Sequence, residues 1–190
     1  MIARYKEDVS WANPYNKIIY NKSLPHDSAY IQLPNIGREA HTFLFHIINN
    51  WDNLATCTVF FQGTFNDQKE QRISSLKKFT EVGADEFYGE NERQDYPPPD
   101  WKYPPSSNIE FSIQQFFEHI LVIHYPPKES WIPGAYISVG QNLIKSRPKE
   151  YYMKLMEYLN SLPTEAQQTT FAHYMERSWK AIFTTNLTHS

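Results

Sequence analysis

Apolar and polar residues recur along this chain at spacings typical of helices and strands in turn. Apolar side chains at helical spacing from Phe43 to Trp51 predict an amphipathic helix, and Asn35 is a good N-cap for its start. The β-branched and aromatic run ATCTVFFQG, residues 55–63, predicts the clearest strand. Helix and strand signals thus follow each other closely in the first third of the chain.

Weaker patterns extend this alternation to the rest of the sequence. Short apolar runs predict strands over 1–5, 16–21 and 131–140, and helical spacing predicts helices over 67–82, 112–120, 148–162 and 164–183. Alternating strands and helices, followed by a helical C-terminal third, predict an α/β layered fold. We expect one domain over residues 1–190, with a Rossmann-like, mixed and mostly parallel central sheet flanked by helices.

A long segment, about residues 83–108, interrupts these patterns. Its centre, YPPPDWKYPP, is too rich in proline for regular structure. A loop of this length within a compact domain is often a functional lid, although a domain boundary would look similar. Tyr96, Trp101 and Tyr103 are interleaved with the prolines, which favours a loop that packs onto the domain.

Charge and hydropathy argue against nucleic acid as a binding partner and against a membrane-spanning segment. The net charge of −3 argues against a nucleic-acid-binding surface, and no run of 18 apolar residues predicts a membrane span. The opening MIARYKED has no signal-peptide hydrophobic region, so we expect a cytoplasmic protein, in the host cytoplasm if it is viral. The chain is equally compatible with being one piece of a longer multidomain polypeptide.

Candidate chemistry lies where predicted strands end and helices begin, because the common nucleotide-binding and hydrolase motifs are absent from the sequence. One polar cluster, ARYKED, follows the first strand, and a second surrounds the helix entrance. There the free N–H groups and the helix dipole favour a phosphate, and Arg38 can add a bidentate contact. Glu39 can orient Arg38, accept a hydrogen bond from a sugar or base, or complement the dipole. A well-capped helix with solvated charges is the alternative.

The third cluster, Gln62, Gly63 and Asp67, follows the clearest strand. Its amide and carboxylate oxygens suit Mg²⁺ or Mn²⁺ carried in with a diphosphate. A glycine turn followed by an Asn/Asp helix cap has the same composition, and both interpretations stay open here.

Six blocks occur in order between Ala3 and Phe183: ARYKEDVSW, IYNK, LPNIGREAHTFLFHIINNWDNL, TVFFQG, GAYISV…IKSRPKEYY and ERSWKAIF. Together they resemble a domain family of unknown function found in fungi, algae and algal viruses. More narrowly, the chain resembles the glycosyltransferase domain of a large chlorovirus (Chlorella virus) protein. This resemblance implies the GT-A fold, a nucleotide-diphosphate-sugar donor such as UDP-glucose, a divalent metal, usually Mn²⁺, and a role in viral glycan biosynthesis.

The resemblance also assigns donor-binding residues. In GT-A enzymes a first strand delivers the nucleotide loop, a later N-x-G segment opens a helix near the diphosphate, and a further segment lines the sugar and acceptor site. The matching positions here are Ala3, Arg4 and Tyr5, then Asn35, Gly37 and Arg38, then Gly134 and Ala135.

Metal binding is where the sequence departs from the family. The strand TVFF ends in Gln62, Gly63 and Thr64 instead of an Asp-x-Asp motif. Gln62 and Asp67 are therefore the candidate metal ligands, with Asp85 or Glu86 as alternatives from the next loop.

The resemblance implies a transferase of the hexosyltransferase type that acts on a glycan, glycoprotein or other hydroxyl acceptor. Glu39, Asp67 and Glu176 are the candidate catalytic carboxylates, and Arg177 and Trp179 lie beside Glu176 on the last helix. A helix-packing Trp with a solvated ion pair explains that last cluster equally well. The alternatives are a catalytically silent nucleotide-sugar binding module and, from another class, a metal-dependent phosphoester hydrolase.

Overall fold

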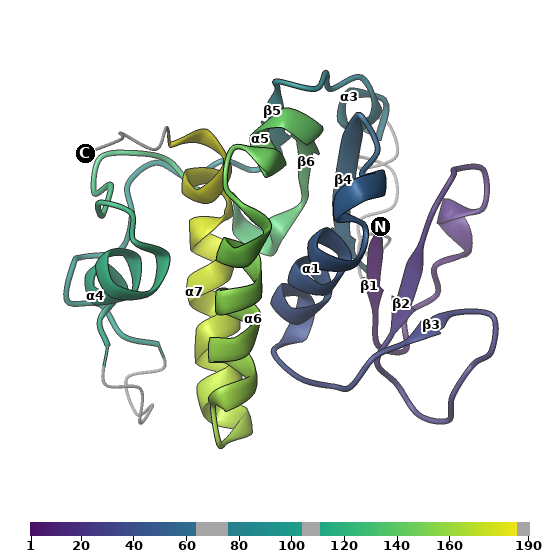
Figure 1. Cartoon of the computed structure of the whole chain (residues 1–190), viewed down its shortest axis with the longest axis horizontal. Helices are drawn as coiled ribbons and strands as arrows, with labels where there is room; N and C mark the ends of the chain where they lie inside the picture. The colour runs from purple at the N-terminus through teal and green to yellow at the C-terminus, as the bar shows by residue number, and fades with distance from the viewer. Residues whose placement is uncertain (64–75, 104–110, 186–190) are drawn as a thin grey trace.

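A mixed β-sheet forms the centre of the computed structural model, which describes residues 1–63, 76–103 and 111–185 (Figure 1). Within these residues the sheet has six strands in the order β3-β2-β1-β4-β6-β5. Strands β3, β2, β1 and β4 are parallel to one another, and β6 is antiparallel to β4 and β5. The strands are β1 (Ile2–Arg4), β2 (Ile19–Asn21), β3 (Ile31–Gln32), β4 (Cys57–Gln62), β5 (Phe87–Gly89) and β6 (Ile137–Gly140). The predicted single-domain α/β fold with a mixed, mostly parallel sheet is confirmed.

Helices α1, α6 and α7 pack against one another on one side of the sheet, and α6 and α7 form the helical C-terminal part that the sequence predicts (Figure 1). No helix in the described ranges is long and apolar enough to cross a membrane. The α-helices are α1 (Arg38–Asn49), α3 (Leu76–Thr80), α4 (Ile113–Gln115), α5 (Gln141–Lys145), α6 (Lys149–Ser161) and α7 (Glu165–Thr184). Short helical turns are η1 (Ser10–Ala12), η2 (Trp51–Asn53), the π-helical η4 (Phe116–Leu121) and η5 (Pro133–Ala135).

The alternation of side chains along β4 divides the core between the two faces of the sheet. Phe60 lies in the larger cluster with residues of α1, α6 and α7, whereas Phe61 lies in a smaller cluster with Phe79 of α3. Both phenylalanines are almost fully buried. Each contributes roughly 1.5–3 kcal/mol through burial. β4 is therefore held from both faces, which fixes the position of its carboxyl end.

Two predicted segments differ from the structure. The segment 83–108 contains a strand, β5, although its described proline-rich part, residues 96–103, has neither helix nor strand. The strand predicted from residue 131 begins only at Ile137, because Gly134 and Ala135 have left-handed φ values of 74° and 51°. An extended strand cannot contain such residues, so the chain forms η5 first.

Candidate functional site

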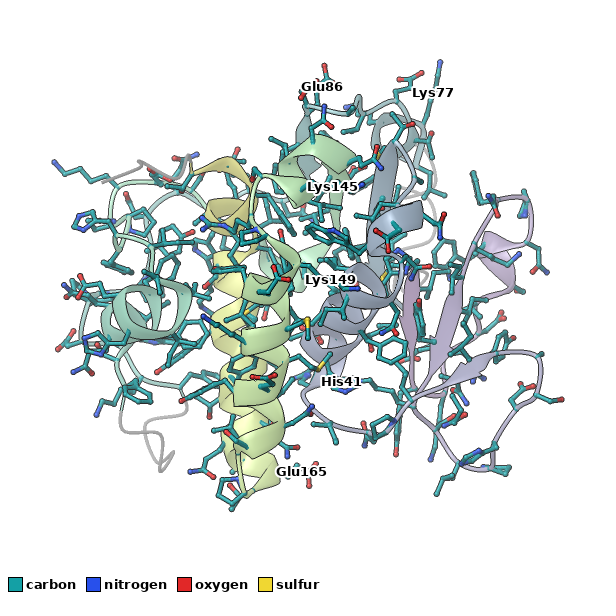
Figure 2. All side chains as sticks on the ribbon, in the orientation of Figure 1. His41, Lys77, Glu86, Lys145, Lys149 and Glu165 are labelled. Atoms are coloured by element: carbon teal, nitrogen blue, oxygen red, sulfur yellow. The ribbon has the colours of Figure 1, made fainter. Side chains whose placement is uncertain are left out.

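A pocket of about 420 Å³ lies at the carboxyl ends of the parallel strands β1, β2 and β4. The strand order changes direction between β1 and β4, and such a switch point is where open α/β sheets bind ligands. Figure 2 places Glu165, at the start of α7, at the end of the molecule opposite Lys77 and Glu86. The lining residues are Ala3, Arg4, Tyr5, Glu7, Lys22, Asn35, Arg38, Glu39, Gln62, Glu165 and Thr169.

The pocket brings together the three polar clusters of the sequence. Seven of the predicted site residues line it: Ala3, Arg4, Tyr5, Asn35, Arg38, Glu39 and Gln62. Gly37, Gly134, Ala135 and Glu176 do not appear among its lining residues, and Asp67 lies outside the described residues. The predicted set therefore divides into residues that line the pocket and described residues that do not.

The entrance of α1 is built differently from the predicted N-cap. Gly37, not Asn35, occupies the cap position, and it makes no side-chain cap hydrogen bond. Both Gly37 and Arg38 are left-handed, with φ values of 57° and 49°. The ammonium of Lys22, just after β2, donates to the carbonyl of Ile36 at 2.6 Å and also to that of Arg38. Lys22 thus holds the tight turn that aims Arg38, and Asn35 is left to line the pocket.

Arg4 carries a positive charge to the pocket in a fixed orientation. Its Nη1 donates to Oδ1 of the buried Asn21 at 2.6 Å, and its Nε donates to the Glu7 carbonyl at 3.0 Å. The guanidinium also lies over the ring of Tyr30, 5.0 Å from its centre. Three different contacts thus hold one cation at the end of β1.

Glu7 closes the loop that follows β1. Its carboxylate accepts hydrogen bonds from the backbone N–H groups of Tyr5 at 2.6 Å and Lys6 at 3.1 Å. A Cβ atom at position 63 would lie 2.6 Å from this carboxylate, so a larger residue there would displace the Glu7 side chain. The Glu7 carboxylate is thus occupied by backbone hydrogen bonds, and it shapes the pocket wall.

Burial shifts the pKa values of two ionisable residues in the wall. Glu39 is only 8% exposed, and burial raises the pKa of its carboxyl group above the usual range. Burial also lowers the pKa of Lys22 to about 7, although the nearby Glu39 opposes that shift. The Nε atom of Arg38 lies 3.8 Å from the Glu39 carboxylate, and the Arg38 side chain is 53% exposed. Arg4 and Arg38 thus supply permanent charge, and Lys22 supplies charge that depends on its surroundings.

Replacing Glu39 with glutamine is expected to stabilise the fold at neutral pH. The native state keeps the Glu39 proton at pH values where an unfolded chain, with a pKa of 4.5, has lost it. Stability therefore falls as pH rises above that value, and glutamine removes this cost. Urea denaturation at pH 7 should show a larger free energy of unfolding for Glu39→Gln than for the wild type, and the gain should vanish below pH 4.5.

Glu157→Gln, on the exposed face of α6, is the matched control and should change the unfolding free energy by less than about 0.5 kcal/mol at either pH. A Glu39→Gln protein that is less stable than the wild type at pH 7 would show that Glu39 is an ionised partner of Arg38 or Lys22.

A connected series of contacts runs behind the pocket from Gln62 to Arg38. Gln62 donates its amide to the Gly134 carbonyl at 2.8 Å, and the Gly134 N–H donates to Oε1 of Glu176 at 2.6 Å. The other carboxylate oxygen of Glu176 lies 3.5 Å from Nδ1 of His173, whose Nε2 lies 3.2 Å from Nη1 of Arg38. Burial raises the pKa of Glu176, but the contacts from His173, Gly134 and Arg177 outweigh it and lower the pKa overall. Glu176 is thus an ionised link within the structure.

The predicted metal ligands do not assemble in the described part of the chain. No group of three or more His, Cys, Asp or Glu side chains suited to a metal occurs among residues 1–63, 76–103 and 111–185. The side-chain nitrogen of Gln62 donates to the Gly134 carbonyl, and the other candidate ligand, Asp67, lies outside the described residues. Asp85 accepts from Asn142 and Glu86 accepts from Gly83, and Figure 2 shows Glu86 at the far end of the molecule from Glu165. Among the described residues the candidate ligands thus form no metal site by themselves, and the Mn²⁺ site, which would include Asp67, stays a prediction.

Comparison with known proteins gives one family match. Residues 1–82 match the family described as "Protein of unknown function (DUF3431)". The DUF3431 match covers β1 to β4 and α1, and so includes every pocket residue except Glu165 and Thr169 of α7. No curated protein and no solved structure matches the chain.

Sequence reasoning missed several residues of the pocket. Lys22 had a usable signal, because it directly follows the strand run IIYN and so sits at a strand's carboxyl end. Glu7 lies inside the ARYKED cluster but was not singled out. Glu165 and Thr169 had no local signal, since only the packing of α7 brings them to the sheet edge.

Proposed function

We propose that the protein is a glycosyltransferase that binds a nucleotide-diphosphate sugar, such as UDP-glucose, in the pocket at the ends of β1, β2 and β4. The observation that carries this proposal is the convergence of Arg4, Lys22 and Arg38 on one pocket at the switch point of the sheet. A diphosphate needs several positive groups in a fixed arrangement, and arginine suits phosphate oxygens because its donors form a planar fork.

The same cations would assist the reaction. When the bond between sugar and diphosphate breaks, negative charge grows on the leaving phosphate, and preorganised positive groups stabilise that charge. Arg4 and Lys22 are already held by several hydrogen bonds each, so little reorganisation is needed. The carboxyl group of Glu39, whose pKa is raised by burial, lines the pocket, where it suits a hydrogen bond to a sugar hydroxyl. A glycan or other hydroxyl acceptor would approach the sugar, and Asp67 stays a candidate base.

Binding of the diphosphate is expected to be coupled to proton uptake. With a pKa of about 7, Lys22 is largely neutral at pH 8 in the free protein. An anion beside it favours the charged form, so the pKa rises and Lys22 takes up a proton. Titration calorimetry with UDP at pH 8, in two buffers of different ionisation enthalpy, should detect this uptake. Lys22→Arg should bind UDP without it, because arginine is already charged.

If Lys22→Arg takes up as many protons as the wild type, Lys22 is not the group that titrates. If neither protein takes up protons, the Lys22 ammonium is already charged before the ligand binds.

A second candidate is a nucleotide-sugar binding module without catalysis. Two carboxylates near the pocket favour this candidate because both already have partners within the protein. Glu7 accepts two backbone N–H groups, and Glu176 contacts Gly134 and His173. Neither is free to act as a base.

Sugar release separates the two candidates. The protein should be incubated with a panel of nucleotide sugars, with and without Mn²⁺, and free sugar and nucleoside diphosphate should be measured. A transferase is expected to hydrolyse one donor slowly when no acceptor is present. Binding without any release, in both metal conditions and with a panel of glycan acceptors, would favour the silent module. Lack of binding to every nucleotide sugar would contradict both.

A further inference from the structure

His173 occupies a defined position between the pocket and the last helix. Its Nε2 lies 3.2 Å from Nη1 of Arg38, and its Nδ1 lies 3.5 Å from Oε2 of Glu176. A guanidinium has donors only, so Nε2 must accept and the ring proton must sit on Nδ1, facing the carboxylate. The two neighbours of His173 thus select a single neutral tautomer.

The carboxylate that orients His173 is itself fixed. Glu176 accepts from the Gly134 N–H at 2.6 Å, and the Gly134 carbonyl accepts from Gln62 at 2.8 Å. Gln62 and Arg38 both line the pocket, so the series begins and ends at the ligand site. It therefore connects the end of β4 with the entrance of α1 through α7.

Tyr103, from the proline-rich segment, also contacts His173. The ring of Tyr103 lies 4.0 Å from the His173 ring, centre to centre. Arg177, one turn further along α7, has its guanidinium 4.6 Å from the ring centres of both Trp101 and Trp131. His173 is 17% exposed and has little freedom to turn.

We infer that His173 is a positioning residue that holds the Arg38 guanidinium at the pocket for the phosphate groups of the ligand. Arg38 needs such a partner because its side chain is 53% exposed and the carboxyl group of Glu39 lies 3.8 Å from Nε. A free arginine side chain loses much rotamer entropy when a ligand immobilises it, whereas an arginine already held loses less. This inference rests on the proposed function in that it assumes an anionic ligand in the pocket.

A double-mutant cycle tests the inference, with UDP as the probe and titration calorimetry as the measurement. His173→Ala should weaken UDP binding about tenfold in the wild type, on the order expected for one ordered side chain. In Arg38→Ala it should have almost no further effect, because the residue that it positions is gone. His173→Gln should restore binding to within about threefold, since a glutamine amide can accept from Arg38 and donate to Glu176. Exposed His124→Ala is the matched control and should bind as the wild type does.

A second measurement does not depend on a ligand. Nitrogen NMR of the imidazole should show His173 as the neutral Nδ1–H tautomer, and Arg38→Ala should shift the Nε2 resonance because that nitrogen loses its hydrogen-bond donor. Equal losses of affinity from His173→Ala in both backgrounds, or an Nε2–H tautomer in the wild type, would overturn the inference. If UDP and the nucleotide sugars do not bind at all, the proposed function fails, and the tautomer still decides whether His173 holds Arg38.

Discussion

Replacing Arg38 with alanine is expected to weaken the binding of UDP by roughly ten- to one-hundred-fold. Hydrogen bonds to charged groups contribute about 1.5–3 kcal/mol, and each 1.4 kcal/mol corresponds to a factor of ten. Arg38 lines the pocket with a half-exposed guanidinium, and it lies in the first turn of α1, where the helix dipole also favours an anion. Titration calorimetry at moderate ionic strength measures the change directly.

Lys77→Ala is a suitable control for this experiment. It removes the same formal charge from an exposed side chain at the opposite end of the molecule from Glu165 (Figure 2). UDP affinity should be nearly unchanged in that variant. Equal weakening by the two substitutions would mean that only the overall charge matters, and unchanged affinity in a folded Arg38→Ala protein would exclude Arg38 from phosphate binding.

Replacing Gly37 with alanine is expected to reduce both stability and affinity. Gly37 has a φ of 57°, which an L-residue adopts only with strain, and a Cβ atom there would lie 2.6 Å from Cδ2 of Leu159. Leu159 is fully buried, so it cannot move aside without disturbing the core. Strain and overpacking of this kind cost about 1–3 kcal/mol in the free energy of unfolding. The shifted turn would also move Arg38, so UDP binding should weaken.

Gly83→Ala provides the comparison for Gly37. The nearest atom to a Cβ at position 83 would be Oε2 of Glu86 at 3.4 Å, which is an ordinary contact. Urea denaturation should therefore show a loss for Gly37→Ala and little change for Gly83→Ala. Similar stabilities for the two variants would show that α1 tolerates a side chain at its entrance, and that its start is less constrained than the contacts of Gly37 imply.

The elements that the sequence predicted best are those with strong local patterns. The apolar periods behind α1, α6 and α7, and the β-branched run of β4, reflect buried positions that recur along each element. β3 has only two residues and β5 only three, too few for any periodic signal, and both exist because neighbouring strands offer partners. Whether such short strands form depends on pairing with neighbouring strands, which a local sequence pattern does not show.

The candidate site was predictable to the extent that it follows from strand and helix ends. Polar residues after β1 and β4 and before α1 meet in one pocket because parallel strands end at the same edge of the sheet. Asn35 is not the N-cap because the ammonium of Lys22, which follows β2, donates the hydrogen bonds that shape the turn before α1. Spacing along α7 could not show that Glu176 binds Gly134 behind the pocket while Glu165 reaches its wall.

The most direct test of the central claim is backbone amide NMR of the protein titrated with UDP-glucose. We expect saturable shifts at Ala3, Arg4 and Tyr5, at residues 35–39 and at Gln62, all around the pocket at the carboxyl ends of the strands. A second pocket, of about 410 Å³ and lined by Asn16, Asn50 and Asn53 among others, includes residues at the start of β4 and serves as an internal comparison. Saturable shifts confined to that second pocket, or no binding of any nucleotide sugar, would contradict the account.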